Sequence, residues 1–290
     1  MTLTLPTPES RRTGSWPLRW LAVLSTGLLL FVAVLTVLMN TGDPIYIPSL
    51  LFLGASVVPA TVTTLVAELD GTRRLSFARL ALAAVLGGVV GGVLAGQLES
   101  DTARAVGSLP YLMVGLIEES AKLAIAVTLL ARRRPRPSAL EGLVFGIAVG
   151  SGFAAMETMG YAFVTLVDNS GNLQSVDSVL LVRALGSLGG HAVWTGLACA
   201  AWYSVRSARH RWLARMRFVA TFAGVVCLHT LWDASAGGLG YLAVGATGVL
   251  VLGVTIWRCR RNARQGSASV GPQPRRELPA STDPLRLPGV

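Results

Sequence analysis

The sequence predicts an all-α protein, a polytopic membrane bundle of about eight transmembrane helices. Hydrophobic residues make up 52% of the 290 residues and charged residues only 14%, a composition that is typical of polytopic membrane proteins and argues against a soluble domain. Apolar runs long enough to cross a hydrocarbon layer of about 30 Å cover residues 18–39, 45–67, 75–98, 109–131, 140–167, 179–205, 218–236 and 239–257.

The distribution of positive charge predicts how this bundle is oriented. A net charge of +10 would suggest nucleic acid binding in a soluble protein, but all but three of the 25 basic residues lie in the two tails, in alternate connections between spans or at the span ends next to them. Because cytoplasmic loops are rich in Lys and Arg, we expect a multi-pass protein of the cytoplasmic membrane, with both termini cytoplasmic and no nucleic acid partner. The exceptions are Arg104, Lys122 and Arg183, and we expect Arg183 to extend to the outer headgroups.

The first three spans carry no buried charge. The run at 18–39 follows a basic flank, as in a signal peptide, but it is too long and lacks a small-residue cleavage pattern, so we expect an uncleaved span. Glycines spaced four residues apart let helix backbones approach closely within a bundle. Such pairs occur in the third span and again in the fifth, at Gly87, Gly91, Gly92, Gly96, Gly142, Gly146 and Gly150.

The fourth span, 109–131, contains Glu118, Glu119 and Lys122. A carboxylate in hydrocarbon is costly, so acidic residues within spans usually face a protein interior or a water-filled cavity, where they do chemistry or move ions. Lys122 follows the two glutamates by four and three residues and therefore shares their helix face. We expect one polar cluster in which Lys122 balances the charge of the glutamates.

The later spans also contain acidic residues and histidines within apolar runs. Phe153 and Glu157 share a face of the fifth span, His191 lies in the sixth, and His229 and Asp233 share a face of the seventh. Counted from the predicted outer ends of the spans, the glutamates and histidines lie at similar depths, about 10 to 18 Å below the outer surface. We therefore expect one site assembled across four helices.

The excess of carboxylates limits the chemistry of this site. A buried cluster with an excess of carboxylates keeps protons on some of them, has cationic histidines or binds a divalent metal. Glu157, His191 and His229 are a candidate Zn²⁺ ligand set with a fourth position for water, and a further glutamate would then act as general base. Without metal, a glutamate would activate water while His229 and Asp233 hold the oxyanion. The residues alone leave both mechanisms open.

Taken together, these residues resemble the four motifs of the PrsW intramembrane proteases. Those motifs are EExxK, FxxxE, H and HxxxD/N on successive spans. The corresponding segments here are Glu118-Glu119-Ser-Ala-Lys122, Phe153-Ala-Ala-Met-Glu157, His191 and His229-Thr-Leu-Trp-Asp233. The resemblance covers 109–236, and the PrsW proteins are similar in turn to the prenyl-endopeptidases that trim CaaX proteins and to related bacterial membrane proteases.

The resemblance implies an intramembrane endopeptidase that uses a glutamate-activated water, with or without a metal. It implies Glu118 or Glu119 as general base, and a membrane-anchored substrate such as a single-pass anti-sigma factor cut near the outer face. It also implies that Glu157 and His191 take part in water activation or metal binding, and that His229 and Asp233 stabilise the transition state. Asp233 stands where the prenyl-endopeptidases have Asn, so its oxyanion role requires a proton or a different function.

The chain is therefore divided into three parts. We expect residues 1–17 to be a disordered cytoplasmic tail, 18–257 to be the membrane domain with its catalytic core at 109–236, and 258–290 to be a disordered, basic cytoplasmic tail. Two other functions use the same acidic layer: a proton- or cation-coupled transporter and a non-catalytic membrane binding protein. A transporter would show interrupted, charged spans in both halves, and the first three spans lack them.

Overall fold

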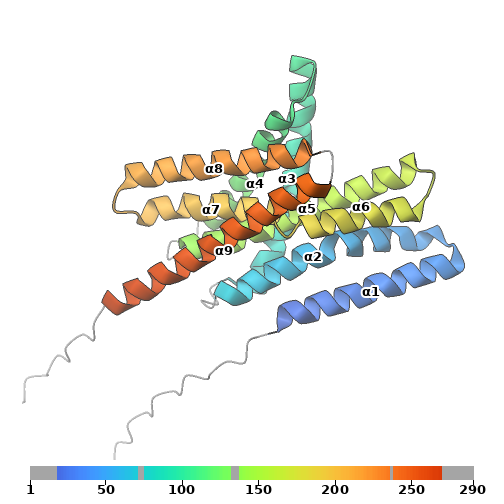
Figure 1. Cartoon of the computed structure of the whole chain (residues 1–290), viewed down its shortest axis with the longest axis horizontal. Coiled ribbons are helices and arrows are strands. Elements are labelled where there is room, and N and C mark those ends of the chain that lie inside the picture. Colours follow the sequence, from blue (N-terminus) through green and yellow to red (C-terminus); the bar gives the residue numbers. More distant parts are fainter. Residues whose placement is uncertain (1–17, 71–74, 132–136, 236–237, 270–290) are drawn as a thin grey trace, which may run out of the picture.

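The computed structural model describes residues 18–70, 75–131, 137–235 and 238–269. Over these ranges it contains only helices, which confirms the predicted fold class. They are α1 (Arg19–Thr41), η1 (Pro44–Tyr46), α2 (Ile47–Asp70), α3 (Phe77–Val106), α4 (Tyr111–Ala131), α5 (Ala139–Asp168), α6 (Leu173–Gly186), α7 (His191–Ser207), α8 (Arg211–Asp233) and α9 (Gly238–Ser269). Figure 1 shows their order along the chain.

Seven stretches of the described chain are long and apolar enough to cross a membrane. Helix α4 is a further helix of 21 residues, but it carries three charges at its centre. The stretch from Leu173 to Arg206 was expected to hold one span at 179–205, and it consists of α6 and α7 separated by a break. The break follows from its sequence, because Gly186, Gly189 and Gly190 weaken a helix at this point.

The last helix is longer than expected. Helix α9 continues to Ser269, so residues 258–269 are helical and not part of an irregular tail as predicted. Arg, Ala and Gln are good helix formers and extend the helix beyond its apolar part. The other residues of the two predicted tails, 1–17 and 270–290, lie outside the described ranges.

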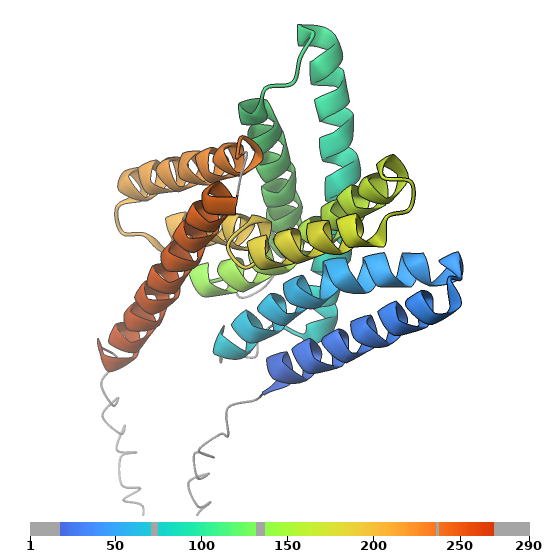
Figure 2. The same ribbon diagram turned by 45° about the vertical axis from the view of Figure 1, so that its right-hand side comes forward.

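Helix α5 is the centre of the bundle. In its apolar window 72% of the residues are buried, compared with 6% in α1, which packs on α2 at the edge. Helices α2, α3 and α7 pack directly on α5. Figure 2 shows α3 and α4 as a hairpin that crosses the remaining helices steeply. This crossing brings the middle of α4 next to the first residue of α7 and the last turns of α8.

Glycines allow α5 to approach its neighbours at backbone distance. A Cβ atom on Gly150 would clash with the carbonyl oxygen of His191, and one on Gly87 of α3 would clash with the carbonyl oxygen of Val149. Gly92 has open space around it, so only part of the predicted glycine pattern of the third span is used for packing. The α5–α7 contact fixes the height of His191 in the bundle.

Candidate active site

The structure brings all the predicted site residues together. Their side chains come from the middle of α4, the middle of α5, the first residue of α7 and the last turns of α8. The residues are Glu118, Glu119, Lys122, Glu157, His191, His229 and Asp233.

Lys122 lies at the centre of the buried charge cluster. Its Nζ lies 2.6 Å from Glu119 Oε1 and 3.1 Å from Glu118 Oε2. The same ammonium lies 2.9 Å from His191 Nδ1 and 4.0 Å from the ring centroid of Phe153. A buried cation needs such partners, and Phe153 adds a cation–π contact. The expected role of Lys122 in balancing charge agrees with these contacts.

Glu119 is sealed inside the protein. Its side chain has no solvent exposure, and Oε1 accepts from Lys122 and lies 3.0 Å from His229 Nδ1. Its other oxygen accepts a hydrogen bond from the hydroxyl of Thr195 at 3.4 Å. Every oxygen of Glu119 is thus occupied, which suits a residue that positions its neighbours. Thr195 was not singled out from the sequence, although it follows His191 by four residues on the same helix face.

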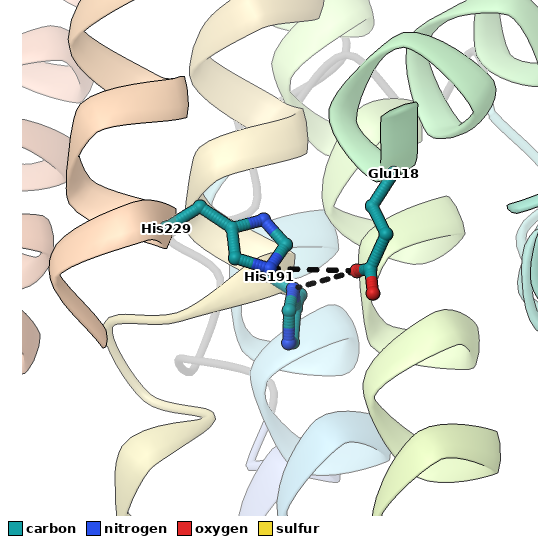
Figure 3. A group of neighbouring side chains, drawn as sticks. All are labelled: Glu118, His191 and His229. Carbon is teal, nitrogen blue, oxygen red and sulfur yellow. Dashed lines mark ion pairs between the residues drawn. The ribbon is translucent and has the colours of Figure 1, made fainter. Parts of the chain in front are cut away.

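Glu118 faces a cavity. Its Oε2 lies 3.5 Å from His229 Nε2 and 4.0 Å from His191 Nδ1, as Figure 3 shows. Its Oε1 makes no hydrogen bond to any residue that the structure describes. Glu118 is therefore the member of the glutamate pair that is available to a bound water.

Each histidine has one nitrogen within 4.0 Å of Glu118 Oε2 and the other next to a second carboxylate. His191 Nε2 lies 2.8 Å from Glu157 Oε2, and His229 Nδ1 lies 3.0 Å from Glu119 Oε1. Histidines that ligate metals usually donate their second nitrogen to a carboxylate, which fixes the orientation of the ring. Both rings have this arrangement, and their centroids are 4.8 Å apart.

Three buried donors lie close enough to share a metal ion. Donor atoms of Glu118, His191 and His229 all lie within 4.8 Å of one another. The sequence suggested Glu157 as the carboxylate of this set, but Glu157 contacts the far nitrogen of His191 and Glu118 takes the inner place. The chemistry of two imidazoles and a carboxylate fits Zn²⁺.

The position of Lys122 affects whether these three residues can bind a metal ion. An ammonium and a metal ion compete for the lone pair of His191 Nδ1, which lies 2.9 Å from Nζ. Metal binding through Nδ1 therefore requires Lys122 to turn fully toward Glu119, its nearer partner at 2.6 Å.

Asp233 lies one turn after His229 on α8. Its Oδ2 is 3.4 Å from His229 Nε2, and the residue lines the same cavity as Glu118. The predicted pairing of these two residues is present in the geometry.

Arg183 of α6 also belongs to the site. Its Nη2 lies 2.8 Å from Glu157 Oε2, its Nε donates to Thr158 Oγ1 at 3.1 Å, and its guanidinium covers the ring of Tyr161 at 4.2 Å. The expectation that Arg183 extends to the headgroups is therefore wrong. Pairing with the half-buried carboxylate of Glu157 holds the guanidinium in the bundle.

The site opens into a cavity of about 730 Å³ between α3, α4, α5, α6, α8 and α9. Glu118, Asp233 and Arg183 line its wall, together with Glu99 of α3 and three tyrosines, Tyr111, Tyr161 and Tyr241. The third span was predicted to end at residue 98, so Glu99 was expected in the connection after it. It reaches the cavity because α3 continues to Val106, beyond the end predicted at residue 98.

This geometry can be compared with known families. A family model described as PrsW family intramembrane metalloprotease matches residues 73–258, more than half of the chain. The chain belongs to the PrsW family. No curated protein and no solved structure matches it.

Membership in the PrsW family confirms the resemblance drawn from the four motifs. The matched range begins just before α3 and includes every residue of the site, whereas α1 and α2 lie outside it. With its apolar helices, the protein is a multi-pass membrane protein of an intramembrane protease family.

Proposed function

We propose that this PrsW protein is an endopeptidase of the cytoplasmic membrane that cleaves a single-pass, membrane-anchored protein such as an anti-sigma factor. The observation that carries the proposal is the position of Glu118. This carboxylate lies against two buried histidines, and each of these is held from behind by another carboxylate. The group lies at the wall of a cavity large enough for a ligand.

In this proposal Glu118 activates the attacking water. As the water oxygen bonds to the carbonyl carbon, a water proton moves to Glu118 Oε1 and the carbonyl π electrons move onto the oxygen. When the C–N bond breaks, its electron pair stays on the nitrogen, which takes up the proton from Glu118. The carboxylate is restored, and an acid and an amine are released.

The other residues orient the reacting groups. Glu119 and Asp233 hold the His229 ring from its two nitrogens, at 3.0 Å and 3.4 Å. Glu157, itself held by Arg183, does the same for His191. Without a metal, the carbonyl oxygen, where negative charge develops, would take its hydrogen bond from the Nε2–H of a protonated His229.

A divalent metal would fit the same group. Glu118 Oε2, His191 and His229 would hold it, and when bound it would polarise the carbonyl and acidify a bound water. Glu118 Oε1 keeps its role in proton transfer.

The test uses the full-length protein reconstituted in liposomes with a panel of single-pass reporters tagged at both ends. Wild type and Glu118→Gln are compared by gel and mass spectrometry. Asp101→Asn is the matched control, because Asp101 is an exposed acid that pairs with Arg104. We expect cleavage by wild type and the control and none by Glu118→Gln. Full cleavage by a folded Glu118→Gln variant would refute the proposal, and cation flux without cleavage would indicate a transporter.

A further inference from the structure

A second hollow lies between the end of α7 and the beginning of α8, at the helix ends opposite to those that carry His191 and His229. It has a volume of about 500 Å³. We call it the arginine pocket, and its lining residues are Trp202, Val205, Arg206, Arg211, Arg215 and Phe218.

The arginine pocket has strong uncompensated positive charge. Its three arginines come from two helices, and none of them pairs with an acid of the described chain. Other arginines of the protein do so: Arg104 pairs with Asp101 and Arg183 with Glu157. The sequence explains the difference, because no acidic residue occurs between Asp177 and Asp233. An external anion is the natural partner of such a group.

Two further donors point to an anion as the ligand. Helix α8 has 23 residues, and the side chain of its N-cap residue His210 does not cap its first amides. A helix N-terminus favours negative charge, and Arg211, the first residue of α8, lines the pocket. The indole Nε1 of Trp202 is buried with no hydrogen-bond partner among the described residues. An oxygen atom in the pocket would give this N–H its missing acceptor.

The surroundings of the pocket favour a lipid over a free anion. The ring of Phe218 lies 5.2 Å from that of Trp202 and 6.1 Å from that of Phe222, so an aromatic strip runs from the pocket along α8. Trp212 and Leu213 of the same helix expose 71% and 49% of their surface. Both helices belong to stretches apolar enough to span a membrane, so the pocket lies where a span ends. Basic pockets at such ends bind lipid headgroups.

We propose that the arginine pocket binds the phosphate of an anionic phospholipid. Arg206, Arg211 and Arg215 contact the phosphate oxygens, the Trp202 N–H donates to one of them, and the acyl chains follow the aromatic strip of α8. This site is independent of the proposed peptidase activity. It joins α7 and α8, the helices that carry His191 and His229, so a bound lipid stabilises the fold by mass action.

The experiment titrates the full-length protein in detergent with three probes: dioctanoyl-phosphatidylglycerol, dioctanoyl-phosphatidylcholine and inorganic phosphate. Binding is followed by native mass spectrometry and by the melting temperature. The pocket variant is Arg211→Gln with Arg215→Gln. The control is Arg209→Gln with Arg217→Gln, which removes equal charge from the same hairpin outside the pocket.

We expect wild type to bind phosphatidylglycerol at least tenfold more tightly than phosphatidylcholine or inorganic phosphate. The pocket variant should lose at least tenfold in that affinity, and the control less than twofold. Equal loss in both variants would show diffuse charge attraction and overturn the proposal, as would equal binding of phosphatidylcholine. Equally tight inorganic phosphate would show a free anion site and overturn the lipid assignment. If the pocket variant does not fold, Trp202→Phe removes only the N–H donor and should weaken binding several-fold; an unchanged affinity would contradict the assignment.

Discussion

His229 of α8 and Glu119 of α4 approach each other to 3.0 Å between Nδ1 and Oε1, in the most buried part of the bundle. This contact fixes the imidazole with Nε2 toward Glu118 and Asp233. It also joins the steep α3–α4 hairpin to α8, so one contact serves both the fold and the chemistry.

The two neighbouring glutamates should respond differently to the same substitution. Glu118→Gln should abolish cleavage and lower the melting temperature less than Glu119→Gln does, because Glu118 lies at the cavity wall and is the more distant partner of Lys122, at 3.1 Å. Glu119→Gln should also destabilise the protein, by about 3 kcal/mol, because it removes the nearest partner of the buried Lys122. Thermal unfolding in detergent, measured beside the cleavage assay, distinguishes the two effects. Equal stability of both variants would contradict the division of roles.

Removal of metal should inactivate the enzyme. Dialysis against a chelator should remove about one equivalent of metal together with cleavage, and Zn²⁺ should restore both. Metal is measured by mass spectrometry of the purified protein. His191→Ala and His229→Ala should lose the metal, because each supplies one donor of the buried group. A chelator-treated protein that contains no metal and cleaves at full rate would show that Glu118 acts alone.

Glu157 should tune metal affinity without being a ligand. Its Oε2 lies 2.8 Å from the far nitrogen of His191, and loss of such an outer carboxylate typically costs 10–100-fold in affinity. Glu157→Gln should therefore weaken Zn²⁺ binding by this factor in a competition titration. Complete loss of metal would instead make Glu157 a direct ligand.

Arg183 should act through Glu157 as a positioning residue. Arg183→Gln should weaken Zn²⁺ binding and lower kcat/KM by at least tenfold, because Glu157 loses its guanidinium partner. Arg183→Lys should recover only part of the loss, since an ammonium cannot hold both Glu157 and Thr158. Arg104→Gln is the control, because Arg104 pairs with an exposed acid in α3. If Arg183→Gln lowers cleavage without any change in Zn²⁺ affinity, the link through Glu157 is wrong.

Two glycines of α5 should differ in whether they tolerate an added methyl group. Gly150→Ala places a methyl group against the His191 carbonyl and should cost about 1–3 kcal/mol of stability and most of the activity. Gly160→Ala, on the same helix with open space around it, should leave cleavage unchanged and should not lower stability, because Ala is the better helix former. Melting temperature and cleavage are the measurements, and equal effects of the two variants would contradict the close α5–α7 packing.

The sequence was most informative where a charged residue interrupts an apolar run. Charged residues such as Glu118 and His229 stand out within apolar runs because their burial is costly, and their helical spacing gives their shared faces. The positions of most helices follow from hydropathy, whereas the break between α6 and α7 and the extension of α9 to Ser269 do not.

The features that sequence reasoning missed depend on contacts between distant segments. Arg183 has no local feature that distinguishes a snorkelling side chain from one paired with Glu157, which is 26 residues earlier in the chain. The choice of Glu118 over Glu157 as the inner carboxylate depends on the steep crossing of α4, which hydropathy does not contain. The break before His191 lies at the cluster of Gly186, Gly189 and Gly190, which the prediction of one continuous span at 179–205 did not take into account.

That break gives the site a source of polarity that belongs to the main chain. Helix α7 begins at His191 with Gly190 as a cap that offers no side chain, so the positive pole of its peptide dipoles is located in the interior of the bundle, next to the carboxylates. Substitution of one side chain at a time leaves this field intact. A survey that substitutes the side chains of the pocket one at a time would therefore not report the part of the transition-state stabilisation that the backbone supplies.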